Sequence, residues 1–153
     1  MTMLELKVPP PLGAAVVAAA MYLVSAWTPG LHLLIPAAAT IAAALGTAGV
    51  AVNVAALWAF RRHRTTVNPL RPDNATALVT DGIFAWTRNP MYLGMALMLT
   101  GWALWLSNIA SLLGPAMFAG YLTRFQIIPE ERLLLAKFGA ALTDYQRRVR
   151  RWI

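Results

Sequence analysis

The sequence contains no cysteine and few charged residues. Only 12% of its 153 residues are Asp, Glu, Lys or Arg, which is about half the share usual in soluble domains. Without cysteine there is neither a disulfide framework nor a thiolate nucleophile. The two histidines, His32 and His63, are far apart in the sequence, so no metal site is predicted. Because 59% of the residues are hydrophobic, a disordered charged tail is also excluded.

Two long stretches of the chain carry no charge at all. Residues 8–60 and 89–123 contain no Asp, Glu, Lys or Arg. A membrane-spanning helix needs about 20 mostly apolar residues, so each stretch predicts two spans. Turn signals at 29–30 (Pro-Gly) and 107–108 (Ser-Asn) divide them. We therefore predict a single-domain, all-α integral membrane protein with four spans, at about 11–28, 32–60, 91–106 and 109–127.

Two other interpretations fit these stretches less well. A buried helical hairpin of a soluble protein would not need an uncharged run as long as 8–60. A cleaved signal peptide would need a positively charged beginning, whereas Glu5 offsets Lys7. We therefore expect the first apolar segment to be retained as a span.

The charged residues all fall on one side of this four-span arrangement. Segment 61–88 has five Arg against two Asp, a net charge of +3, and segment 124–153 has seven Lys or Arg against three acids, a net charge of +4. Because cytoplasmic loops are rich in Lys and Arg, both termini and both segments are predicted to be cytoplasmic, at an inner or plasma membrane. The cations then form a collar suited to anionic membrane lipid, and nucleic acid is not an expected partner despite the net charge of +7.

Polar residues stand beside the predicted start of the third span. Pro90 is typical of a first helical turn, and Asn89 is expected at the N-cap of that helix. The free N–H groups of a helix start attract anions. Arg88, which comes directly before them, is therefore suited to hold the carboxylate of a ligand in two hydrogen bonds.

The second charged segment begins with Pro129, Glu130 and Glu131, a favourable helix start. Apolar residues then recur every three or four positions, so an amphipathic cytoplasmic helix is predicted at about 130–148. Ionisable groups at membrane depth tend to be functional. The two acids and the nearby Arg124 are therefore equally consistent with a helix terminus and with a polar ligand site.

The two charged segments each contribute to a sequence motif. The first, 78–94, reads Leu-Val-Thr-Asp-Gly-Ile-Phe and then Arg-Asn-Pro-Met-Tyr-Leu-Gly; the second, 129–149, contains Pro-Glu-Glu-Arg, Phe-Gly, Tyr and Val. In this order, on either side of a helical hairpin, they resemble the integral-membrane isoprenylcysteine carboxyl methyltransferase and phospholipid methyltransferase superfamily. The resemblance covers about 65–153. Three positions depart from the family pattern: Asn89 replaces a common His, Ile83 a common Pro, and Gln126 an Arg of some relatives.

The resemblance implies an enzyme that transfers a methyl group from S-adenosylmethionine to a lipophilic or small-molecule acceptor at the cytoplasmic membrane interface. The acceptor group is a carboxylate, an amine or a thiol. The residues implied to bind or shape the cofactor site are Gly82, Phe84, Arg88, Asn89, Pro90, Tyr92, Glu130 and Glu131. Two catalytic roles are hypotheses: Glu131 assists deprotonation of an amine or thiol, and Arg124 orients an anionic acceptor, unless Arg124 only pairs with Glu130 or Glu131.

Two other functions are alternatives. Sterol reductases resemble this superfamily in their C-terminal half and bind NADPH, although a 2′-phosphate would call for more clustered Arg or Lys. A non-catalytic membrane protein that binds a partner or anionic lipid is the other. Neither the acceptor nor the oligomeric state follows from the sequence, although Gly46 and Gly49 would permit two helices to pack closely.

Overall fold

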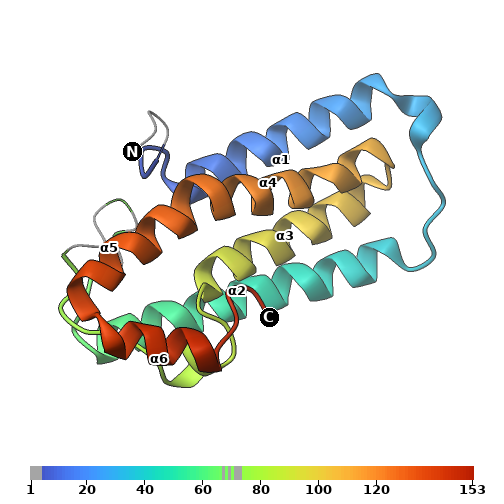
Figure 1. Ribbon diagram of the computed structural model, residues 1–153. Coiled ribbons are helices and arrows are strands. Elements are labelled where there is room, and N and C mark those ends of the chain that lie inside the picture. Colours follow the sequence, from blue (N-terminus) through green and yellow to red (C-terminus); the bar gives the residue numbers. More distant parts are fainter. Residues whose placement is uncertain (1–4, 67, 69, 71–73) are drawn as a thin grey trace.

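The computed structural model describes residues 5–66, 68, 70 and 74–153. Its long elements run up and down beside one another, and a cluster of shorter helices lies at one end (Figure 1). The first two are α1 (Pro10–Trp27) and α2 (Ala38–Arg62), and the next two are α3 (Pro90–Leu106) and α4 (Leu113–Leu122). The all-α prediction is confirmed.

Helix α2 packs along α3 through glycines that let the two backbones approach. A Cβ placed on Gly49 would lie 2.5 Å from the carbonyl oxygen of Gly94, and one on Gly101 would lie 2.8 Å from that of Ala42. Such contacts between small residues are typical of helices packed in lipid. Gly49 is therefore used for packing within the chain, whereas a Cβ on Gly46 would meet nothing within 4 Å.

The core lies between α1, α3 and the α4 region. Its fully buried side chains include Phe118, Leu122 and Ile127, which cluster with Met95 and Leu99 of α3. By contrast, the outer faces of the bundle are apolar and exposed. The large exposed apolar side chains of α1 and α2 include Leu12, Val16, Tyr22, Leu23, Ile41, Val50, Val54 and Trp58.

Helices α1 and α2 are each long and apolar enough to cross a membrane. Only 17% of the apolar stretch of each helix is buried inside the chain, whereas the core helix of a soluble protein would be mostly buried. The exposed apolar surface therefore fits a lipid environment, and α3 is a shorter apolar helix of similar character.

The boundaries differ from the sequence prediction at two places. Helix α2 begins at Ala38 rather than near 32, because residues 29–31 form a short 3-10 turn and Pro36 follows. His32 instead forms an isolated bridge to Asn108. The fourth segment does not end at 127: a π-helix, η5 (Thr123–Ile127), joins α4 directly to α5 (Ile128–Phe138).

The prediction of a single C-terminal helix at 130–148 is wrong. This segment forms two helices, α5 and α6 (Ala140–Arg148), which are separated at Gly139, a residue with a positive φ of 51°. Glycine adopts this conformation without the strain that a Cβ would add. The break turns α6 back beneath the bundle, so that it lies beside the cluster of helix ends rather than extending from α5 (Figure 1).

Candidate functional site

A cavity of about 360 Å³ lies at the end of the bundle where α1 and α3 begin and α2 ends. Its volume falls within the range of small-molecule sites, roughly 300–1,000 Å³. Both sequence motifs contribute to its walls. Predicted site residues that line it are Phe84, Arg88, Asn89, Pro90, Tyr92, Glu130 and Glu131.

The first motif reaches the cavity through a short 3-10 turn, η3 (Gly82–Ala85), followed by the start of α3. Phe84 is buried and meets Phe60 of α2 edge to face, with ring centroids 5.1 Å apart. Asn89 stands at the N-cap position of α3, but its side chain does not cap the helix. It donates instead to the backbone oxygen of Arg151 at 2.9 Å. The predicted N-cap position of Asn89 is therefore confirmed, and its side chain fixes the C-terminal residues.

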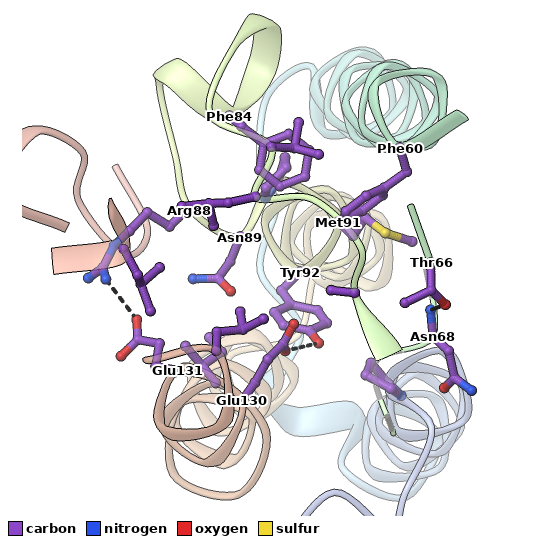
Figure 2. Close-up of a pocket in the computed structure, with 18 of the residues that line it drawn as sticks. Phe60, Thr66, Asn68, Phe84, Arg88, Asn89, Met91, Tyr92, Glu130 and Glu131 are labelled. Atoms are coloured by element: carbon purple, nitrogen blue, oxygen red, sulfur yellow. Dashed lines mark hydrogen bonds and ion pairs between the residues drawn. The ribbon is translucent and has the colours of Figure 1, made fainter. Parts of the chain in front are cut away.

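Glu131 is held between two arginines. Its Oε1 lies 3.0 Å from Arg88 Nη1, an ion pair that crosses one side of the cavity in Figure 2. Arg151 approaches the same carboxylate with two donors, Nη2 at 2.7 Å from Oε2 and Nε at 3.2 Å from Oε1. Such a two-pronged contact is the strongest geometry for this pair. Both carboxylate oxygens of Glu131 are therefore engaged.

Glu130 faces a different set of partners, although it is the adjacent residue. Tyr92 Oη donates to its Oε2 at 2.9 Å, and Figure 2 shows the pair near the middle of the cavity. Gln126 of the π-helix also hydrogen-bonds to Glu130. Burial raises the pKa of Glu130 to about 7, and the nearby charge of Glu131 adds to the increase. Glu130 can thus gain or lose a proton near neutral pH.

The π-helix explains how Gln126 enters the site. Residues 126 and 127 are buried, whereas Arg124 is exposed. A π-helical turn shifts the faces of the residues that follow it, and such turns are frequent at functional sites. Here Ile127 packs with Tyr92 and Met95 of α3 and lines the cavity, while Gln126 hydrogen-bonds to Tyr92 and Glu130.

Helix α6 closes the cavity from the C-terminal side. Tyr145 Oη donates to the backbone oxygen of Phe84 at 2.6 Å, which joins the two motifs directly. Burial raises the pKa of Tyr145 to about 12, so the phenol is neutral and available as a donor. The break at Gly139 is what allows α6 to reach this position.

Two predicted site residues lie away from this cavity. Gly82 lines a separate hollow beside Trp58, Arg62 and Asp81. Arg124 is exposed and pairs with Glu5 at 3.3 Å, as Arg132 does at 3.0 Å. The alternative that Arg124 pairs with Glu130 or Glu131 is therefore wrong. The Glu5 side chain is only 3% exposed, so this ion-pair cluster fixes the N-terminal segment to the outside of the π-helix.

Sequence reasoning missed several residues of the cavity. Pro9–Pro11 at the start of α1 and Phe60 at the end of α2 line it, together with Tyr145 and Gln146 of α6. Phe60 and the prolines come from segments without a motif. The only available signal was their common position at the charged ends of predicted spans. Tyr145 was part of the second motif, but its contact with Phe84 depends on the turn at Gly139.

The fold and the site define an all-α protein with lipid-compatible outer faces and a partly charged cavity at one end. A comparison with known protein families matches residues 37–141 to the phospholipid methyltransferase family. This match covers more than half of the chain, so the protein belongs to that family. The family supports methyl transfer in a membrane context, and the suspected superfamily is confirmed.

Two curated proteins are similar to parts of the chain. An uncharacterized protein of Haemophilus influenzae is 43% identical over 63 residues, 41% of this chain and 100% of that protein. A protein-S-isoprenylcysteine O-methyltransferase of Schizosaccharomyces pombe is 36% identical over 75 residues, 47% of this chain. This chain spans only 30% of the length of the second protein. No solved structure matches the chain significantly.

Proposed function

We propose that this protein is an integral-membrane methyltransferase that uses S-adenosylmethionine and methylates a lipophilic or small acceptor. The observation that carries the proposal is the convergence of both motifs on one cavity. Arg88 of the first motif pairs with Glu131 of the second, and Tyr92 of the first pairs with Glu130 of the second. Family membership and the apolar outer surface support the same function.

The residues present fit such a cofactor. Arg88 has hydrogen-bonding capacity beyond its pair with Glu131, because its buried Nε has no partner among the described residues. A buried donor of this kind calls for a ligand or a water molecule, and we assign Arg88 to the cofactor's carboxylate. Phe84 would form an apolar wall and Asn89 a polar one. Once bound, the cofactor would supply a methyl group that is already activated by its positive sulfur.

For the transfer itself, the protein needs only to align the donor with the acceptor and to exclude water from the site. Apolar side chains of α2, α3 and α6 supply dry walls, among them Phe60, Met91, Met95 and Leu142. Among the described lining residues, Arg88 is the only cation, and it is already paired. A 2′-phosphate would need more positive charge than this, so the cavity favours methyl transfer over a reductase that binds NADPH.

We further propose that α1, α2, α3 and the α4–π-helix segment cross the membrane and place the cavity on the cytoplasmic side. All described Lys and Arg residues lie in the segments at the cavity end of the bundle. The opposite end consists of the uncharged connections 28–37 and 107–112. The positive-inside rule then supports a cytoplasmic cavity and cytoplasmic termini.

Calorimetric titration of the detergent-purified protein with S-adenosylhomocysteine, and in parallel with NADPH, tests the cofactor. We expect saturable binding of S-adenosylhomocysteine that weakens at least tenfold in Phe84→Ala. Trp86→Ala is the matched control, because Trp86 is 80% exposed and does not line the cavity. Binding of NADPH alone would support a reductase, and binding of neither ligand by the folded protein would support a non-catalytic role.

A further inference from the structure

Gly82 of the first motif lines a second hollow, which lies between α2 and the η3 turn. The volume of this hollow is about 220 Å³. Sites for drug-sized molecules begin at roughly 300 Å³, so the hollow can hold only part of a large ligand. Its lining shares no described residue with the lining of the cavity, and the proposed methyl transfer therefore leaves it without a role. The hollow is lined by Ala55, Trp58, Ala59 and Arg62 of α2 and by Asp81, Gly82 and Ile83.

The hollow lies beside the exposed apolar face of α2. Trp58 is 62% exposed, and Val54, one turn earlier on the same face, is 59% exposed. Helix α2 is long and apolar enough to cross a membrane, and the hollow lies in its last turns, at the end of the bundle where the described Lys and Arg residues gather. Trp is typical of the boundary between membrane and water. In the proposed membrane arrangement, the hollow is therefore at the depth of the lipid headgroups.

Arg62 brings a positive charge to this hollow. Its Cζ lies 5.6 Å from the centroid of the Trp58 ring, and it forms no ion pair with any described residue. Asp81, the carboxylate of the hollow, instead receives a hydrogen bond from His63 Nε2 at 2.8 Å. A guanidinium presents several N–H donors in one plane, a geometry that matches the oxygens of a phosphate. The donors of Arg62 are therefore suited to bind a phosphate group.

From this arrangement we propose that the hollow binds an anionic phospholipid of the cytoplasmic leaflet. The lipid phosphate lies against Arg62, and one acyl chain enters the hollow beside Ala55 and follows the exposed face of α2 past Val54. This inference goes beyond the proposed methyl transfer. It rests only on the proposed membrane arrangement, and the bound lipid is not the methyl acceptor, because the hollow is separate from the cavity.

Both parts of the lining decide the choice of occupant. A soluble phosphate would use Arg62 but would leave the apolar side chains of the hollow in contact with water, whereas an acyl chain covers them. The headgroup is expected to be anionic, because three arginines, at positions 61, 62 and 64, are close in sequence to the hollow and Asp81 is its only described acid. Each such cation near a membrane surface favours anionic lipid.

The bound lipid should also stabilise the η3 turn. It would contact residues 81–83, and the next residue, Phe84, is part of the cavity wall. A ligand that binds only the folded state raises its stability. We therefore expect the thermal midpoint of the delipidated protein to rise when the lipid is added back.

The test adds dioleoylphosphatidylglycerol or dioleoylphosphatidylcholine to the delipidated protein in a neutral detergent. Native mass spectrometry counts the bound lipids, and the thermal midpoint reports their effect. We expect one phosphatidylglycerol to bind at least fivefold more tightly than phosphatidylcholine and to raise the midpoint. Arg62→Ala should weaken this binding at least fivefold. Ala55→Phe, which fills the hollow and keeps every charge, should weaken it as much.

Two matched controls separate this site from general attraction to the basic end of the bundle. Arg148→Ala removes an exposed arginine of α6, and Val50→Phe adds the same ring to the exposed face of α2 outside the hollow. Both should bind phosphatidylglycerol like the wild-type protein. An equal loss in Arg148→Ala and Arg62→Ala, or unchanged binding in Ala55→Phe, would overturn the proposal.

Inorganic phosphate is the remaining comparison. If it raised the thermal midpoint as much as phosphatidylglycerol does, the site would be one for a soluble anion and the lipid proposal would be wrong; equal binding of the two lipids would contradict the anionic headgroup. Arg62→Ala should bind S-adenosylhomocysteine within twofold of the wild-type protein, because Arg62 does not line the cavity. Failure of the lipid site therefore leaves the proposed function intact, and failure of S-adenosylhomocysteine binding leaves the lipid site intact.

Discussion

Arg151, close to the C-terminus, donates two hydrogen bonds to the carboxylate of Glu131, and the shorter of them is 2.7 Å long. The backbone around it is tied to the start of α3: Arg88 N donates to the oxygen of Arg150, and Asn89 donates to that of Arg151. Residues 150 and 151 thus connect the first motif, through Arg88 and Asn89, with Glu131 of the second motif. They are part of the structure that holds Arg88 and Glu131 in place.

Replacement of Arg151 should loosen this junction. Arg151→Ala removes both side-chain bonds to Glu131 but leaves the backbone contacts in place. Because Arg151 is about one-third exposed, we expect a loss of roughly 1 kcal/mol, or about 2–4 °C in the thermal midpoint in detergent. Arg150→Ala is the matched control, since the exposed Arg150 contributes its backbone oxygen. Equal midpoints for the two variants would contradict this role.

The titration of Glu130 should make stability depend on pH. Its pKa is about 7 in the folded protein against an ordinary value of 4.5, so the folded state binds the proton more tightly. The resulting stabilisation is complete below about pH 4.5 and is lost as the pH rises to 7. Relative to Glu130→Gln, the wild-type protein should lose up to about 3 kcal/mol across that interval. Thermal midpoints of both proteins from pH 5 to 8 measure the difference, and parallel curves would refute the assignment.

Because α2 and α3 are in close contact at Gly49, one methyl group added there should lower the stability of the protein. Gly49→Ala would place its Cβ 2.5 Å from a backbone oxygen of α3, so the helices must separate. Overpacking of this kind costs about 1–3 kcal/mol. Gly46→Ala, one turn earlier on the same helix, meets open space and should be neutral or slightly stabilising. A thermal midpoint that falls equally in both variants would show that the close contact at Gly49 is not responsible for the loss.

Glu5 should strengthen the attachment of the N-terminal segment to the π-helix and the start of α5. Glu5→Gln removes the partner of Arg124 and Arg132, while Leu6 N still donates to the oxygen of Phe125. We expect faster hydrogen exchange at residues 5–8 and in the π-helix, by about tenfold or more. Lys7→Gln is the control because Lys7 is exposed. Unchanged exchange in Glu5→Gln would mean that backbone contacts alone hold the segment.

The absence of cysteine makes the membrane arrangement directly testable. Leu34→Cys lies in the connection between α1 and α2, where Leu34 is 99% exposed, and Arg148→Cys lies at the opposite end of the bundle. In intact cells a membrane-impermeant maleimide should label the first variant only, and permeabilised cells should show labelling of both. Labelling of Arg148→Cys in intact cells would invert the proposed orientation.

The sequence was sufficient for features that depend on local composition. Uncharged stretches of spanning length predicted the apolar helices, because a helix in lipid must satisfy its own backbone and expose apolar side chains. Pro90 marked the start of α3, and the paired motifs predicted seven of the residues that line the cavity. The break at Gly139 was missed because the apolar spacing continues across it.

Tertiary structure decided how neighbouring polar residues are divided among partners. Successive residues of a helix point about 100° apart, so Glu130 and Glu131 face Tyr92 and Arg88 respectively. Arg124, close to both acids in sequence, is turned outward by the π-helix toward Glu5, which lies 119 residues away. Composition and spacing established which residues gather at this end of the bundle. Which carboxylate pairs with arginines and which accepts hydrogen bonds from neutral side chains depends on contacts between distant segments, and sequence spacing does not encode those contacts.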